Sequence, residues 1–404
     1  MSLLEFSKAC FLVLRQSQFL IGRLESGISR WSICSSEVPL HVQNSTSVHE
    51  AALKFSGGRK LISVESLHQG HIHETFISTW NSDGETSRML HQRMNSQVFQ
   101  DIPGLMHNIK RVTEQLRLDT WRARDYQLEV LEVIATNDGE AWATLPDGAW
   151  RTFTFVDGTD TFDHCQGSEQ AYGAAVAFGN FQARLLDLDA RELVETIPSF
   201  FSSTHRLRQF QAALRADVKD RARSIRSEIE FVLAHAYLLE LVETGQAQGR
   251  IPVRVIHGDT KLNNVLFDKT TGAARCIVDL DTCMPGWSLY DFGDLVRFAV
   301  SVSAEDETDL TRVGLDQDIY RAIEAGWMDS AGAFLNADEL ELMPLAAAIV
   351  TLTVGLRFLT DHLAGDEYFK IQRENQNLDR ARVQFEMVRI MERNAAVVAP
   401  VTSS

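Results

Sequence analysis

Hydrophobic and polar positions alternate in the first third of the chain, and this period of two predicts β-strands. Five short strands are expected, at residues 61–66, 75–80, 88–94, 128–135 and 150–155. The pair Asp83-Gly84 between the second and third strands is typical of a hairpin turn. Between the third and fourth strands the period changes to that of a helix, whose apolar face is formed by Leu105, Ile109, Val112 and Leu116.

The second part of the chain is mainly helical by the same criterion. One apolar stripe recurs at helical spacing from Ala171 to Leu185, and Asn336 with Glu339 predicts a capped helix start. Three short strands interrupt the helices, at residues 253–256, 265–267 and 276–279. The apolar run 345–356 is too short to span a bilayer, so we expect a buried helix there.

These patterns divide the chain into three parts. Residues 1–47 have weak periodicity and are interpreted as an N-terminal extension of unassigned role. Residues 48–157 form a small, strand-rich lobe, and residues 158–404 form a larger, mainly helical lobe. The expected fold class is therefore α+β with two lobes, joined at the polar connector 156–166.

Charge and cysteine content limit the possible partners. The formal net charge of −16 disfavours nucleic acid, because an acidic surface repels phosphate backbones. Five cysteines, an odd number without a CxxC pair, argue against a disulfide framework and favour a reducing compartment. We expect a cytoplasmic protein without a membrane partner; the sequence does not specify an oligomeric state.

The segment from His257 to Asn264 carries the clearest chemistry. It follows an apolar strand and has the spacing HxDxxxxN. Phosphoryl transfer needs an oriented hydroxyl, an acceptor for its proton and cations on the phosphates. Asp259 on a tight loop can serve the hydroxyl, and Lys261 can place positive charge on the transferred group. The amide oxygen of Asn264 suits magnesium.

A second acidic pair follows at Asp279 and Asp281. Asp279 is expected to bridge metal and phosphates, and Asp281 to point to the same side of the strand because side chains alternate. His257, Asp291 and Asp294 are interpreted as residues that organise the loop backbone. For Arg297 a ligand contact and a structural ion pair are both open, and for Trp287 both sugar stacking and core packing.

These residues resemble those of the aminoglycoside phosphotransferase and choline kinase superfamily. The resemblance implies a two-lobed, protein-kinase-like fold that uses ATP and Mg. It assigns Asp259 as the catalytic aspartate, Asn264 and Asp279 as metal ligands, and Asp281 as the second acidic residue of the family. No P-loop motif occurs, which excludes that class of nucleotide-binding protein.

Shorter segments resemble the N-acetylhexosamine 1-kinases within this superfamily. They lie at 70–76, 92–99, 281–286, 290–294 and 357–369. This closer resemblance implies that Gly70 and His71 belong to a nucleotide-binding loop. His73 replaces the usual asparagine of that loop, and the third strand has no lysine. Arg93 is the candidate replacement for the ATP-binding lysine, with Glu114 as its candidate partner.

The resulting hypothesis is an ATP- and Mg-dependent kinase of a small molecule. The anomeric hydroxyl of an N-acetylhexosamine is the first candidate acceptor, which makes an amino sugar the expected partner. Other acceptors in the same class are an aminoglycoside, a choline-like amino alcohol or another sugar. A nucleotide-binding pseudokinase scaffold is the alternative from a different class, and the presence of Asp259, Asn264 and Asp279 argues against it.

Overall fold

A computed structural model describes residues 44–67, 72–118 and 128–398. The chain forms two compact units, each with its own core. The first comprises Met1–Ser96 with Val133–Phe155, and the second comprises Gln97–Glu132 with Val156–Ser404. The N-terminal antiparallel sheet followed by a mainly helical region is the protein-kinase-like fold expected from the sequence.

An antiparallel sheet of five strands dominates the first unit, in the order β1-β2-β3-β5-β4. The strands are β1 (Lys60–Leu67), β2 (Glu74–Ser82), β3 (Glu85–Arg93), β4 (Ala143–Leu145) and β5 (Gly148–Thr154). The predicted turn between β2 and β3 is confirmed. Asp83 and Gly84 have φ angles of 53° and 92°, and positive φ at both central residues gives the hairpin its twist-compatible turn.

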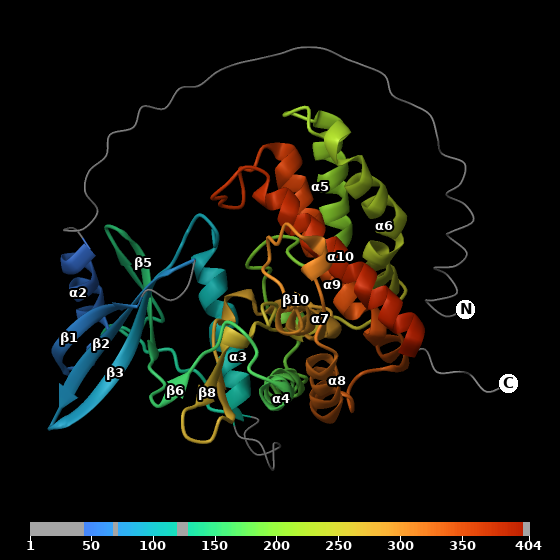
Figure 1. Ribbon diagram of the computed structural model, residues 1–404. Coiled ribbons are helices and arrows are strands. Elements are labelled where there is room, and N and C mark those ends of the chain that lie inside the picture. The colour runs from blue at the N-terminus through green and yellow to red at the C-terminus, as the bar shows by residue number, and fades with distance from the viewer. Residues whose placement is uncertain (1–43, 68–71, 119–127, 399–404) are drawn as a thin grey trace. The chain divides into compact units, whose positions relative to one another are not determined.

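Helix α2 (Asn44–Lys54) covers part of this sheet (Figure 1). Its buried side chains Val48, Ala51 and Phe55 share a core with Phe76 and Trp150 of the strands. The expected end of the N-terminal extension, residue 47, therefore falls inside a packed helix.

Two expectations for this region need correction. Residues 128–135 form no continuous strand, and only isolated bridges occur, from Glu129 to Cys276 and from Val133 to Phe153. These two partners belong to different units, so no single ladder can form along the segment. Helix α3 (Ile102–Leu118), assigned by the sequence to the strand-rich lobe, contacts elements of the second unit instead.

Helices make up most of the second unit. After α3 they are α4 (Ser168–Arg184), α5 (Ser203–Ala216), α6 (Arg226–Ala247), α7 (Ser288–Ala299), α8 (Gln317–Ala331), α9 (Ala337–Ala364) and α10 (Gln376–Val398). Figure 1 shows α9 and α10 side by side, with α5 and α6 close to them, and these helices are in contact.

Five short strands complete this unit in two small sheets. One contains β6 (Thr159–Asp160), β8 (Val265–Asp268) and β9 (Ala274–Ile277), and the other pairs β7 (Arg254–Ile256) with β10 (Met284–Gly286). The loops that leave β7 and β9 contain the predicted chemical residues.

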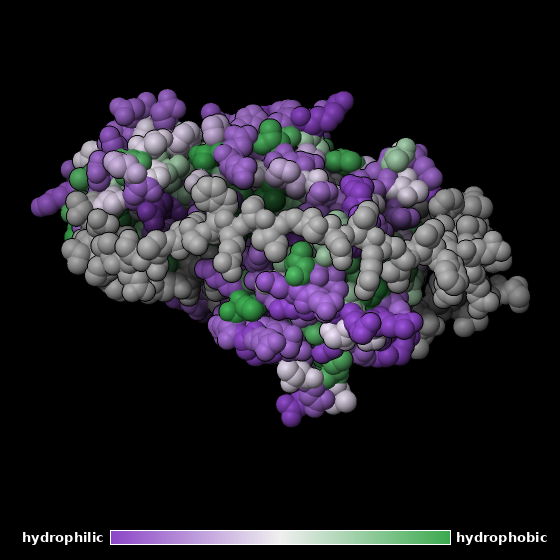
Figure 2. Space-filling model, turned by 90° about the horizontal axis from the view of Figure 1, so that it is seen from above, coloured by the Kyte–Doolittle hydropathy of each residue, from purple (hydrophilic) through white to green (hydrophobic). Residues whose placement is uncertain are grey.

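The long helix α9 forms the centre of the helical core. Among the described residues it alone is long and apolar enough to cross a membrane, yet 78% of its most apolar stretch is buried inside the protein. This burial is what a core helix requires, and the expected buried helix at 345–356 is confirmed. The face visible in Figure 2 is mainly hydrophilic where described residues appear, with apolar side chains as separate spots.

The start of α9 tests the helix-capping interpretation. The Asn336 side chain accepts a bond from the Glu339 amide at 2.9 Å, and the Glu339 side chain accepts one from the Asn336 amide at 3.0 Å. We predict that Asn336→Ala lowers the free energy of unfolding by about 1 kcal/mol, measured by urea denaturation. Asn336→Ser, which keeps a capping oxygen, is the control. Equal loss in both variants would contradict a capping role.

Candidate active site

The loop after β7 is held in place by one carboxylate of α7. Asp291 accepts hydrogen bonds from the backbone amides of His257 and Gly258, each at 2.8 Å. The amide of Gln182 on α4 donates to the same carboxylate at 2.6 Å. Burial raises the pKa of Asp291, and His257, Gln182 and the two amides offset part of this shift. The loop backbone is therefore fixed from α7.

A second carboxylate of α7 holds the next residue. The Thr260 amide donates to Asp294 at 3.1 Å, and the Thr260 hydroxyl donates to the Asp291 carbonyl at 2.6 Å. Asp294 also forms a buried ion pair with Arg297 at 2.9 Å. The expectation that Asp291 and Asp294 organise the loop backbone is confirmed, and Arg297 has the structural ion pair that was one of its two options.

His257 is fully buried and lies between the edges of the Phe178 and Phe181 rings. Its Nδ1 accepts from the Asp259 amide at 3.3 Å, so its Nε2 carries the proton and donates to the Val278 carbonyl at 3.0 Å. The imidazole thus connects the loop after β7 with the segment after β9. Its structural role, expected from the sequence, is confirmed.

Gly258 explains why the loop can turn sharply before Asp259. Its φ angle of 82° lies in the left-handed region, which favours glycine. A Cβ at this position would also collide with the ring of Phe201 and the carbonyl of Thr282. Any larger residue would displace the loop that carries Asp259.

Two other predicted residues, Lys261 and Asn264, meet at the side chain of Asp259. The Asn264 amide nitrogen donates to the Asp259 carbonyl at 2.7 Å and to its carboxylate at 3.1 Å. The ammonium group of Lys261 lies 2.7 Å from the same carboxylate oxygen. The loop therefore turns back within five residues, as the spacing predicted.

Lys261 lies in the field of several acidic groups. Burial acts to lower its pKa, but attraction to Asp259, and then to Asp279 and Asp294, outweighs burial, so the pKa of Lys261 is raised. The side chain is therefore cationic at neutral pH. Because Asp279 contributes to the raised pKa of Lys261, its carboxylate belongs to the same group of charges as Asp259 and Asp294.

The acidic pair after β9 has a different geometry from the one expected. β9 ends at Ile277, Asp279 has φ 63° and ψ 59°, and Asp281 lies in the 3-10 turn Leu280–Thr282. The alternation of side chains along a strand therefore does not apply, and that reason for placing Asp281 beside Asp279 was wrong. Asp281 is only 3% exposed, whereas the left-handed conformation of Asp279 is uncommon for a non-glycine residue and typical of functional turns.

The side-chain oxygens of Asn264 and Asp279 fit magnesium better than an ion whose ligands must all come from the protein. Magnesium commonly takes one or two protein carboxylates together with phosphate oxygens and water. The amide oxygen of Asn264 and the carboxylate of Asp279 are hard oxygen donors of this kind. Among the described residues no group of three His, Cys, Asp or Glu side chains is placed to hold a metal.

The residues assigned to nucleotide binding are only partly described. Gly70 and His71 lie outside the described residues. Arg93 forms ion pairs with Glu74 and, at 3.4 Å, with Asp147, both in the first unit. Glu114 pairs with Lys110 and Arg111 along α3. Each of the two residues therefore has its partners within its own unit. The expected pairing of Arg93 with Glu114 stays a prediction.

A cavity of about 460 Å³ lies beside the loop after β7 in the second unit. Phe201 forms part of its wall, packs against Gly258 and lies 4.5 Å from the ring of Tyr290. The other aromatic wall residues are Phe200, Trp287 and Tyr290 itself. Serine, threonine, glutamine and glutamate side chains supply further polar groups: Ser199, Ser202, Ser203, Thr204, Thr353, Gln246, Glu195 and Glu243.

Trp287 combines both roles considered for it. It is 4% exposed, as core packing requires, yet it also lines the cavity, and its indole nitrogen has no hydrogen-bond partner among the residues that the structure describes. A buried indole N–H normally has a partner, so a bound polar ligand would satisfy it. Sequence reasoning missed Phe200 and Phe201, because they lie in an aperiodic loop before α5.

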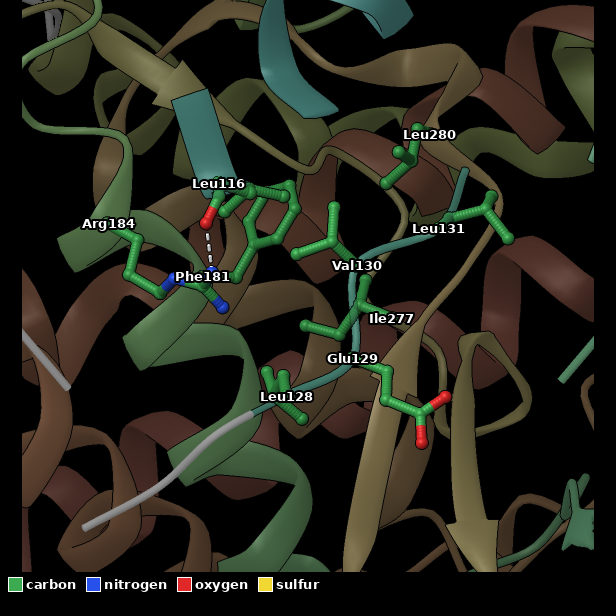
Figure 3. A pocket seen from close by; sticks show the side chains of 9 residues that line it. All are labelled: Leu116, Leu128, Glu129, Val130, Leu131, Phe181, Arg184, Ile277 and Leu280. Atoms are coloured by element: carbon green, nitrogen blue, oxygen red, sulfur yellow. Dashed lines mark hydrogen bonds between the residues drawn. The ribbon is translucent and has the colours of Figure 1, made fainter. Parts of the chain in front are cut away.

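A smaller pocket lies between the end of α3, α4 and β9 (Figure 3). Its walls are mainly apolar, and Arg184 donates to the Leu116 carbonyl at its edge. Its volume of about 10 Å³ accommodates at most one water molecule. It is therefore a packing feature and no acceptor site.

Several solved structures share this fold. An aminoglycoside phosphotransferase from Alicyclobacillus acidocaldarius is 13% identical, with 90% of this chain and 98% of that chain covered and a TM-score of 0.56. A microcompartment-associated aminopropanol kinase is 16% identical, with coverages of 87% and 98% and a TM-score of 0.50. The GDP and kanamycin complex of APH(2")-IIia is 12% identical, with coverages of 87% and 99% and a TM-score of 0.50.

The family model provides the sequence counterpart to this shared fold. Residues 83–325 match the model described as APH, the phosphotransferase enzyme family. This region comprises more than half of the chain and contains Asp259, Lys261, Asn264, Asp279 and Asp281. With the catalytic loop formed as its spacing predicted, the chain belongs to the phosphotransferase enzyme family.

Proposed function

We propose that this protein is an ATP- and Mg-dependent kinase that phosphorylates the anomeric hydroxyl of an N-acetylhexosamine. The observation that carries the kinase proposal is the convergence of Lys261 and Asn264 on Asp259, on a loop whose backbone is fixed by α7. Phosphoryl transfer depends on positioning and electrostatics, and this loop provides both.

In this proposal Asp259 orients the acceptor hydroxyl and takes up its proton. The Asp259 side chain is one-fifth exposed, so a substrate hydroxyl can reach it. Lys261, now paired with Asp259, is cationic and can pair with the oxygens of the transferred phosphoryl group. This partner exchange would release Asp259 to the hydroxyl as the phosphate arrives.

When bound, magnesium would supply positive charge against the phosphates of the nucleotide. Asn264 and Asp279 are the residues proposed to hold it. The bonds from the Asn264 nitrogen to Asp259 direct the amide so that its oxygen is the group left for a cation. Asp281 is the proposed additional acidic residue near this site.

The donor proposal is ATP, with Gly70, His71 and Arg93 as nucleotide contacts. It rests on the resemblance of residues 70–76 and 92–99 to nucleotide-binding segments. One similar structure contains GDP, so a comparison of ATP with GTP belongs in the first assay. The proposal includes a cytoplasmic location, which rests on the odd cysteine count and the unpaired thiols of Cys165, Cys276 and Cys283.

The acceptor proposal rests on the cavity and on the segments that resemble N-acetylhexosamine 1-kinases. Aromatic walls with a few hydroxyl, amide and carboxylate groups suit a sugar ring, which has both apolar faces and polar edges. Segment 281–286 runs from the acidic turn into β10 at this cavity.

The first functional prediction concerns the proton acceptor. Asp259→Asn keeps the size and the bond from Asn264 but removes the carboxylate, so kcat should fall about 10²- to 10⁴-fold. Nucleotide affinity should change little. The measurement is steady-state nucleotide consumption together with nucleotide binding, with Asp318→Asn, an exposed position on α8, as the control. Wild-type turnover in Asp259→Asn would remove Asp259 from the mechanism.

The second prediction concerns the metal. Asp279→Asn tolerates the left-handed conformation but removes one negative charge, so the fold should persist while the magnesium dependence of nucleotide binding is lost. Affinity for a fluorescent nucleotide analogue should be measured with Mg²⁺ and with EDTA, for the wild type and the variant. Equal wild-type affinities under both conditions would show that the metal assignment is wrong.

The third prediction concerns the site of phosphorylation. A 1-kinase needs a hemiacetal hydroxyl, so the 1-O-methyl glycoside of the best sugar should not be phosphorylated. Product analysis by phosphorus NMR distinguishes an anomeric phosphate from a phosphate on another carbon. Phosphate transfer to a ring or primary hydroxyl of the methyl glycoside would overturn the anomeric assignment and leave the kinase proposal intact.

A further inference from the structure

Phe298 is an aromatic residue in the last turn of α7, near the loop that carries Asp259. It is 37% exposed, and it is the one exposed residue in the segment 291–300. The ammonium nitrogen of Lys261 lies 5.6 Å from the centre of the Phe298 ring. The ring is thus a second neighbour of Lys261, in addition to the carboxylate of Asp259.

A second cation approaches the same ring. The guanidinium carbon of Arg297 lies 4.0 Å from its centre. A single apolar side chain at the surface is ordinary, but two cations on one exposed ring are a specific arrangement. Both distances lie within the range of about 6 Å over which the ring quadrupole attracts a cation. The ring therefore holds positive charge at the junction of α7 and the loop after β7.

One carboxylate fixes both sides of this contact. Asp294 accepts a hydrogen bond at 3.1 Å from the amide of Thr260, the residue next to Lys261. It also forms the buried ion pair at 2.9 Å with Arg297, the residue next to Phe298. The two residues that meet, Lys261 and Phe298, are therefore each adjacent to a residue held by Asp294. The fold brings them together before any ligand is bound.

The two neighbours of Lys261 hold it in different ways. Asp259 lies 2.7 Å away and neutralises the ammonium charge. This pair must separate before the carboxylate can serve a hydroxyl and the ammonium group can serve a phosphate. The ring of Phe298 has no net charge, so it attracts the ammonium group and leaves the full positive charge available to a phosphate.

The proposed reaction needs such a neighbour at one step. The acceptor oxygen bonds to the terminal phosphorus, the bond to the nucleoside diphosphate breaks, and the hydroxyl proton passes to Asp259. At that moment Lys261 has exchanged Asp259 for the phosphate, and its flexible stem needs another contact to keep it in place. In the described part of the chain, the ring of Phe298 is the contact that remains at its ammonium group.

We propose that Phe298 is a positioning residue for phosphoryl transfer, whose ring holds the ammonium group of Lys261 while Asp259 turns to the acceptor hydroxyl. This inference rests on the proposed kinase function and adds to it a residue that acts through Lys261. Phosphoryl transfer depends on how exactly charge is placed. Phe298 should therefore affect the rate of transfer and leave substrate affinity unchanged.

The test replaces Phe298 by mono-, di- and trifluorophenylalanine in the full chain. Successive fluorines withdraw electron density from the ring and weaken its attraction for a cation, while its shape is nearly unchanged. With ATP, Mg²⁺ and N-acetylglucosamine, kcat should fall step by step, by about twofold to fivefold over the series, at constant KM for both substrates. A ring that only fills space would give the same kcat throughout.

A second measurement needs no catalysis. Urea unfolding of the same series, with Lys261 present and in Lys261→Met, separates the contact of Lys261 from that of Arg297 on the same ring. Fluorination should lower the folding equilibrium constant more when Lys261 is present, by an additional factor of about two to five. An equal effect in both backgrounds would show that the ring does not hold Lys261.

Phe334 offers a matched control away from Lys261. It lies between α8 and α9, and the guanidinium carbon of Arg254 is 5.2 Å from the centre of its ring. Fluorination of Phe334 should leave kcat unchanged, and its effect on unfolding should not depend on Lys261. Among natural side chains, Phe298→Tyr keeps the aromatic face and should retain most of the kcat, whereas Phe298→Leu should lower kcat at least as far as trifluorophenylalanine does.

The outcomes separate this inference from the kinase proposal. An active kinase whose kcat is the same across the fluorine series would overturn the role of Phe298 and leave the kinase proposal intact. A wild-type chain that transfers no phosphate would reject the kinase proposal and, with it, the role in transfer. The unfolding series would then still show whether the ring of Phe298 holds Lys261.

Discussion

The loop after β7 depends on one interaction. The backbone amides of His257 and Gly258 donate hydrogen bonds to the carboxylate of Asp291. This carboxylate is buried within the helical unit, where an unpaired charge would be strongly unfavourable. The two amides and Gln182 supply the hydrogen bonds that make its burial tolerable. The same bonds fix the backbone at the point where β7 ends. The hydrogen bonds that offset the burial of the Asp291 carboxylate therefore also fix the loop that carries Asp259.

Further bonds extend from Asp291 to the residues that are proposed to carry out the chemistry. Asp294 holds the Thr260 amide, and His257 connects the loop to the carbonyl of Val278 after β9. The backbone thus sets the positions of Asp259, Lys261 and Asn264. Their side chains add the contacts that join them to one another. This division explains why changes at Asp259 are expected to affect turnover more than folding, whereas changes at Asp291 would remove the support of the whole loop.

The sequence predicted those parts of the protein that are specified locally. The hairpin at Asp83-Gly84 follows from the need for positive φ, and the meeting of Asp259 with Asn264 follows from a five-residue spacing. The prediction that Asp279 and Asp281 alternate along a strand was wrong, because the chain adopts a left-handed conformation at Asp279. A pattern of alternating residues does not encode that conformation. The segment 128–135 has strand-like composition, but its partners lie in different units. The cavity wall joins the loop before α5 with β10, α7 and α9, and no local pattern reports such a contact.

The net charge of the chain does not predict the charge of the acceptor. A ligand in the cavity responds to the charged groups of the wall, and above all to those that have no partner in the protein. The two glutamates of the cavity wall are engaged by backbone amides. Glu195 accepts from Ser199 at 2.9 Å, and Glu243 accepts from Thr204 at 3.2 Å, in the first turn of α5, where the helix dipole favours a carboxylate. These acidic groups therefore stabilise the loop and the helix that form the wall. The net charge of the whole chain therefore does not describe the wall, where both carboxylates already accept hydrogen bonds from backbone amides.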